Sequence, residues 1–152
     1  GRKDVMSMIA PEGPAYLAGT LSGNPVAVAA GTAMLDLLRT VNPYKRMEQL
    51  REYLCEGFRL AAVRAGVPLR LQSTASMFTP FFLDGEATDY KTAIRADKAA
   101  YGRFFHVMLA RGVYLPPAQW EAGFVSYALT DKELDHAIGA AVFAMQAAAN
   151  KS

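Results

Sequence analysis

Residues 19–25, with the sequence GTLSGNP, combine residue types that could bind an anion. Gly19 lets the backbone approach a ligand closely, and Thr20 offers a hydroxyl. Asn24 or Ser22 is expected to cap the helix that follows, with Pro25 at its first position. Backbone N–H groups at a helix N-terminus favour a phosphate or a carboxylate. An ordinary capped loop has the same composition, so these residues alone leave both interpretations open.

Glu121 is the second candidate, within the sequence PPAQWEAG at residues 116–123. Short strands are expected on both sides, at 113–115 and 124–128, and a loop between strands can direct a side chain into a cleft. A loop glutamate is more often simply solvated. Trp120 beside it could cover a cleft or pack against the protein, and the sequence does not decide between the two.

The other reactive side chains favour structural roles. The acidic loop at residues 84–89 does not have the spacing of a calcium loop, and neither His106 nor His136 has a second ligand at zinc spacing. We therefore expect no metal site. Cys55 lies in a helical pattern without an apparent cationic partner, which favours a packed or half-exposed thiol. A lone cysteine fits a reducing compartment, so we expect a cytoplasmic protein.

Composition excludes several classes of protein. The chain has 152 residues, of which 52% are hydrophobic and 20% charged, enough for a folded core. A net charge of +2 without a basic run argues against a nucleic-acid partner. The uncharged residues 13–35 are interrupted by prolines and glycines, so we reject a membrane span. The chain shows no signal peptide and begins without methionine, which is consistent with an excised piece.

Periodicity predicts an α+β fold, in which a small antiparallel sheet packs with long helices. Helices are expected at 2–8, 25–39, 42–66, 90–111 and 130–145, the third with Asn42 as its cap and the last with a capping box. Strands are expected at 67–72, 77–83, 113–115 and 124–128. Pro80 in the second strand indicates an edge strand or a bulge. The buried faces of the two longest helices are expected to carry Tyr44, Met47, Leu50, Leu54, Phe58, Ala61 and Ala62 in the first, and Ile94, Tyr101, Phe104, Phe105, Met108 and Leu109 in the second.

The helix expected at 25–39 carries no charge before Asp36. A helix that is apolar on every side needs cover on every side, which a domain of this size does not supply. We therefore expect another domain or a partner subunit to cover it. The alternative is that its alanine, glycine and threonine positions tolerate exposure.

Nine blocks of this sequence follow one another in a familiar order. They are RKDVM (2–6), APEGP (10–14), AGTLSGNP (18–25), SMFT (76–79), DG (84–85), TDY (88–90), RFFH (103–106), GVYL (112–115) and EAGFVS (121–126). The series resembles the C-terminal part of the glutamate-1-semialdehyde 2,1-aminomutase family. These enzymes depend on pyridoxal 5'-phosphate (PLP) and are similar to class III aminotransferases. The resemblance spans nearly the whole chain.

The resemblance implies the C-terminal small domain of a fold type I PLP-dependent transferase. Residues 1–40 would be a linking segment with an interface helix, and residues 41–152 the α+β domain. The implied reaction is an internal amino-group exchange that converts glutamate-1-semialdehyde to 5-aminolevulinate for tetrapyrrole synthesis. In the family, the counterpart of Thr20 contacts the cofactor phosphate across a homodimer, where Gly19 permits close approach. The counterpart of Glu121 lies near the small-molecule substrate.

In this family the lysine that holds the cofactor precedes the segment. The lysines present lie in polar settings or on the solvent side of helices: Lys3, Lys45, Lys91, Lys98, Lys132 and Lys151. We therefore expect a piece that lacks the catalytic lysine, is inactive alone and does not retain the cofactor. One alternative is the C-terminal part of a class III ω-aminotransferase, which shares a similar SGNP loop. Another is a non-catalytic α+β module for dimerisation or binding.

Overall fold

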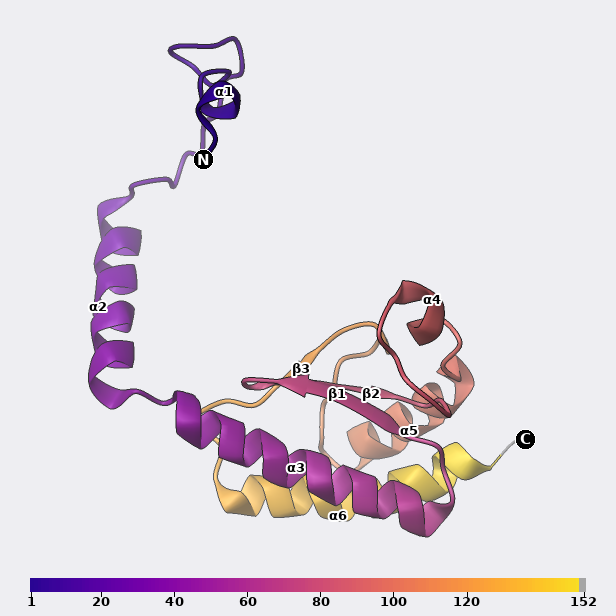
Figure 1. The fold of residues 1–152 in the computed structure, drawn as a ribbon. Helices are drawn as coiled ribbons and strands as arrows, with labels where there is room; N and C mark the ends of the chain where they lie inside the picture. The colour runs from indigo at the N-terminus through magenta and orange to yellow at the C-terminus, as the bar shows by residue number, and fades with distance from the viewer. Residues whose placement is uncertain (151–152) are drawn as a thin grey trace. The chain divides into compact units, whose positions relative to one another are not determined.

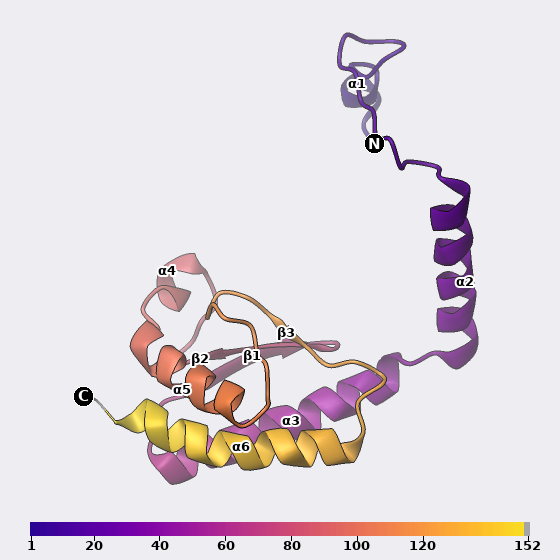
Figure 2. The same cartoon turned by 180° about the vertical axis from the view of Figure 1, so that it is seen from behind.

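The computed structural model describes residues 1–150, which divide into two compact units, one of residues 1–42 and one that begins at Pro43 (Figures 1 and 2). In the first unit, α1 (Lys3–Met6) leads into a loop closed by a bridge between Ile9 and Ala15. α2 (Pro25–Val41) begins where the sequence predicts, because Asn24 Oδ1 accepts the N–H of Val26 at 3.0 Å and of Ala27 at 3.2 Å. No residue of α2 is buried.

Asn42 does not cap the third helix, so that prediction is wrong. It ends α2 in the left-handed conformation, with φ of 45°, and its N–H donates to the Leu38 carbonyl at 3.0 Å. Asparagine tolerates this conformation, which gives it a second use at helix C-termini. α3 (Tyr44–Ala65) begins after Pro43 without a side-chain cap.

The second unit places helices against a small sheet, which confirms the expected α+β class. Its strands are β1 (Arg70–Thr74), β2 (Met77–Phe81) and β3 (Gly123–Phe124), antiparallel and in the order β1-β2-β3. Its remaining helices are α4 (Tyr90–Ala93), α5 (Lys98–Ala110) and α6 (Asp131–Ala149). α6 packs against both α3 and α5, and α3 and α6 lie on the same side of the sheet in both views (Figures 1 and 2).

Phe58 of α3 occupies the centre of the core. Its ring meets Phe78 of β2 at 6.1 Å and Phe104 of α5 at 5.9 Å, both edge to face. α3 also approaches α6 closely, because Gly57 has no side chain: a Cβ there would lie 2.5 Å from Ile138 Cγ1. The hydrophobic core therefore connects the sheet with the helices α3, α5 and α6.

The strands are shorter than the sequence predicts. β1 starts at Arg70 rather than at 67, residues 113–115 form no strand, and β3 has two residues instead of five. Pro80 lies in the middle strand, yet β3 pairs only with Met77 and Phe78. The expected edge strand or bulge is therefore wrong, because β2 is the middle strand and pairs with β1 in an unbroken register. The proline is tolerated because, within the described residues, only β1 pairs with β2 at Pro80.

The single helix expected at 90–111 is wrong. α4 ends at Ala93 and α5 begins at Lys98, because Asp97 Oδ1 accepts the N–H groups of Ala99 and Ala100, each at 2.9 Å. This second cap signal within the apolar pattern was not recognised as a break. The expected burial of three side chains is also wrong: the exposed ones are Tyr44 at 57%, Ile94 at 45% and Leu109 at 44%.

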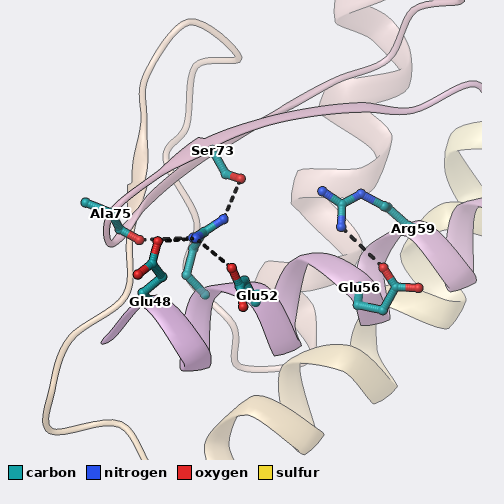
Figure 3. A network of polar contacts seen from close by, with 7 residues as sticks. Glu48, Glu52, Glu56, Arg59, Ser73 and Ala75 are labelled. Carbon is teal, nitrogen blue, oxygen red and sulfur yellow. Dashed lines mark hydrogen bonds and ion pairs between the residues drawn. The ribbon is translucent and has the colours of Figure 1, made fainter. Parts of the chain in front are cut away.

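Arg51 joins α3 to the β1–β2 turn, as Figure 3 shows through its labelled partners. Its Nε donates to the Ala75 carbonyl at 3.0 Å and its Nη1 to Ser73 Oγ at 2.9 Å. Nη2 lies 3.4 Å from Glu48 and 3.3 Å from Glu52. Arg51 is only 8% exposed, so the guanidinium is a buried group that holds the hairpin on the helix layer.

Candidate functional site

The GTLSGNP loop forms two consecutive turns. Ser22 N–H donates to the Gly19 carbonyl at 2.9 Å, and Asn24 N–H donates to the Leu21 carbonyl at 3.1 Å. A Cβ at position 19 would lie 2.5 Å from Ser22 Oγ, so a side chain there would displace the Ser22 hydroxyl. Among residues 1–150, neither the N–H nor the hydroxyl of Thr20 has a hydrogen-bond partner, and Thr20 is exposed. The loop thus offers two free donors next to the N-terminus of a 17-residue helix.

Glu121 lies in the loop between Leu115 and β3. Its side chain is exposed and its N–H donates to the Ala118 carbonyl at 3.0 Å. It borders a hollow of about 360 Å³, which is also lined by Tyr114, Pro117 and Phe124. The carboxylate therefore stands at the edge of a small, largely apolar depression.

Tyr101 of α5 is hydrogen-bonded to this loop. Its hydroxyl donates to the Pro116 carbonyl at 2.5 Å, and the residue is 4% exposed. Burial, followed by the charge of Glu121, raises the pKa of Tyr101 to about 12, so the phenol stays protonated as a donor. Tyr101 lies within the helix expected at 90–111, but the sequence does not predict this hydrogen bond. A buried aromatic position occupied by tyrosine instead of phenylalanine is the signal that could have indicated it.

Trp120 belongs to the same loop and packs against neighbouring side chains. Its ring centroid lies 6.4 Å from that of Phe81, and Lys98 Nζ lies 5.2 Å from the Trp120 ring. Trp120 is 42% exposed, and Gln119 next to it is 3% exposed. Within the described residues, neither side-chain polar atom of Gln119 has a partner. The structure thus supports the packing interpretation of Trp120, and a role in covering a cofactor cleft stays a prediction.

The predicted site residues divide between the two units. Gly19 and Thr20 share one turn of the first unit, while Glu121 belongs to the second. Their assigned roles in cofactor and substrate binding stay predictions, as do the roles of residues 1–40 and 41–152.

The remaining reactive groups have local roles. Cys55 is fully buried and burial raises the pKa of its thiol, which confirms a packed structural thiol. His136 Nε2 lies 2.8 Å from the Arg111 carbonyl oxygen, and the ring of the exposed His106 meets that of Phe105 edge to face at 5.5 Å. Every lysine within residues 1–150 is exposed, and Lys151 lies outside the described residues.

The described part of the chain contains neither a cluster of metal-binding side chains nor a membrane-spanning helix. Among residues 1–150, no group of three or more His, Cys, Asp or Glu side chains is arranged to hold a metal ion. In the same range, no helix combines the length and apolar character that a membrane span requires.

The sequence matches curated proteins along nearly its whole length. It is 46% identical over 150 residues to the glutamate-1-semialdehyde 2,1-aminomutase of Roseiflexus castenholzii. That alignment covers 99% of this chain and 35% of the relative. The chain is 48% identical over 141 residues to the enzyme of the same name from Myxococcus xanthus, covering 93% and 33%. The chain is homologous to part of glutamate-1-semialdehyde 2,1-aminomutase. It spans about a third of the length of the curated aminomutases it matches.

Solved transaminases share the fold. An ω-transaminase from Sphaerobacter thermophilus aligns with a TM-score of 0.82 and 28% identity, over 99% of this chain and 35% of its own. A transaminase with PLP bound aligns with a TM-score of 0.73 and 26% identity, over 95% and 33%. The expected small α+β domain of PLP-dependent transaminases is therefore confirmed. No family model matches the sequence.

Proposed function

We propose that this chain serves a PLP-dependent aminomutase that converts glutamate-1-semialdehyde to 5-aminolevulinate. The observation that carries the proposal is the level of identity, 42–48% to curated aminomutases along at least nine-tenths of the chain. The solved transaminases are only 26–28% identical. An ω-aminotransferase and a non-catalytic module are therefore not favoured.

The turn around Thr20 fits a cofactor phosphate. Within the described residues it leaves an N–H and a hydroxyl unpaired at the N-terminus of α2, and Gly19 has no side chain that could block the approach. When bound, PLP carries the exchanged amino group and withdraws electrons from the bond that loses a proton. Thr20 would donate to a phosphate oxygen and so fix the position of the ring for the chemistry. The lysine that holds the cofactor would belong to another part of the protein.

Glu121 would act on the substrate side. A carboxylate at the edge of an apolar hollow orients a cationic amino group and holds or releases a proton there. We also propose a homodimer in which Thr20 reaches the cofactor of the neighbouring subunit. The apolar residues of α2 support this, since Val26 is 78% exposed and Leu35 62% exposed.

The activity is tested on the complete enzyme that contains this segment. We expect it to form 5-aminolevulinate from glutamate-1-semialdehyde without an external amine donor. An enzyme that needs a separate amine donor and a keto acid acceptor, and forms no 5-aminolevulinate, would refute the aminomutase. The 152-residue chain alone should show no turnover and no cofactor absorbance after desalting.

Thr20→Val tests the phosphate contact in the same enzyme. Loss of one hydrogen bond to a charged group costs about 1.5–3 kcal/mol, so the PLP dissociation constant should rise about 10- to 100-fold. Thr40→Val is the matched control, because the Thr40 hydroxyl bonds only the Asp36 carbonyl of its own helix, at 2.8 Å. An unchanged PLP dissociation constant in Thr20→Val removes Thr20 from the site.

A further inference from the structure

The loop of residues 116–121 is attached to α5 at both of its ends. At the first end, the Tyr101 hydroxyl donates to the Pro116 carbonyl at 2.5 Å. At the other end, Lys98 lies over the ring of Trp120, 5.2 Å from its centroid. Lys98 and Tyr101 are three residues apart on one helix and so share a face. The N-terminal half of α5 therefore contacts the loop at Pro116 and at Trp120, the residue just before Glu121.

The Tyr101 attachment is the more rigid of the two. Its ring meets Phe82 at 6.2 Å and Phe104 at 6.1 Å, so burial fixes the hydroxyl in place. Lys98 is an exposed, flexible side chain whose contact with an indole competes with water. Within the described residues, the Tyr101 bond is the one hydrogen bond that ties residues 116–121 to another element.

We infer that Tyr101 is a positioning residue for Glu121, which it keeps at the edge of the hollow by holding the Pro116 end of the loop. The role of Glu121 on the substrate rests on the proposed function. The attachment of the loop to α5 is independent of that function. The raised pKa of Tyr101 agrees with it, because the charge of Glu121 is one of its causes. A misplaced catalytic group loses much of its effect, so holding this loop matters for rate.

The attachment is tested in this chain with Tyr101→Phe, which keeps the ring and removes the hydroxyl. The readout is hydrogen exchange of the Glu121 amide, which is bonded to the Ala118 carbonyl at 3.0 Å. A lost hydrogen bond should speed its exchange about three- to tenfold. The Val125 amide, bonded to the Ser76 carbonyl at 2.8 Å outside the loop, should not change.

Tyr53→Phe is the matched control. It also removes a tyrosine hydroxyl, one that donates to Asp135 at 2.6 Å on the α3–α6 surface. The exchange of the Glu121 amide should stay unchanged in this variant. Equal exchange rates in wild type and Tyr101→Phe, or an equal acceleration in Tyr53→Phe, would overturn the inference. If Tyr101→Phe does not fold, Glu121→Gln is the second variant. The pKa of Tyr101 should then fall, because the charge of Glu121 helps to raise it. An unchanged pKa of Tyr101 would show that the loop does not hold Glu121 near Tyr101 and would overturn the inference.

The consequence for catalysis is tested in the complete enzyme. Tyr101→Phe should lower kcat about three- to tenfold, in step with the exchange rate, and should add nothing when Glu121 is already replaced by glutamine. Faster exchange with an unchanged kcat would overturn the positioning role. The proposed activity would survive that result as long as the unaltered enzyme forms 5-aminolevulinate, so the two failures are distinguishable.

Discussion

Arg51→Met should destabilise the second unit, because it removes the guanidinium that joins the β1–β2 turn to α3. Methionine retains most of the apolar stem, so the loss is polar. The hydrogen bonds to the Ala75 carbonyl and Ser73 Oγ are charge-assisted and together amount to about 3–6 kcal/mol before compensation. Ala75 is exposed and its carbonyl regains water, and the cost of burying the guanidinium disappears.

The ion pairs of Arg51 with Glu48 and Glu52 add little, because both carboxylates are more than half exposed. We therefore expect the free energy of unfolding to fall by about 2 kcal/mol, with an unchanged denaturant m-value. The assay is urea unfolding followed by helical circular dichroism. Arg59→Met is the control on the same helix, since Arg59 pairs only with Glu56, at 3.3 Å, and is half exposed. The reasoning is refuted if both variants lose the same free energy.

Three further outcomes follow from individual contacts. Because the folded pKa of Tyr101 is raised above its unfolded value of about 10, its stabilising effect is complete below pH 10 and is lost between pH 10 and 12. Allowing for solvent screening of Glu121, alkaline unfolding curves of wild type and Tyr101→Phe should diverge by about 1–3 kcal/mol in that window. Gly57→Ala should destabilise by about 1–3 kcal/mol in urea unfolding, because its Cβ meets α6, whereas Gly102→Ala, whose Cβ meets nothing within 4 Å, should stabilise by about 0.5–1 kcal/mol. Gln119→Leu should raise the melting temperature, since it removes two buried polar atoms without partners and restores about 1 kcal/mol or more; an unchanged or lower melting temperature would indicate an unseen partner.

Local signals predicted those parts of the fold that depend on a few neighbouring residues. The expected capping box of the last helix is present between Thr130 and Glu133, and the helix expected to end at 66 does end there, at the left-handed Gly66. Asn24 provides the cap of α2. Asp97 carries a local cap signal for the break before α5, but the apolar periodicity of residues 90–111 runs across it. The contact that ties this break to the rest of the unit is distant, because the Asp97 N–H donates to the Phe82 carbonyl at 2.8 Å. Strand ends failed for the same reason, since β3 exists only where β2 offers it a partner.

The candidate site divides in the same way. The turn at Gly19 could be predicted from its own residues, and so could a loop around Glu121. The side chains that hold that loop could not, because Tyr101 and Lys98 reach it from a helix 15 or more residues earlier, and no sequence pattern links them. Arg51 is a similar case, because an arginine within a helix gives no sign that it will be buried against a hairpin 22 and 24 residues away.

The burial of the lone cysteine makes its modification a measure of how often the second unit opens. The thiol of Cys55 is 0% exposed on the inner face of α3, so a thiol reagent in solution can modify it only after that helix layer opens. The modification rate at saturating reagent is then the rate at which the second unit opens around Cys55. Every substitution discussed above in that unit can be ranked by this one reaction.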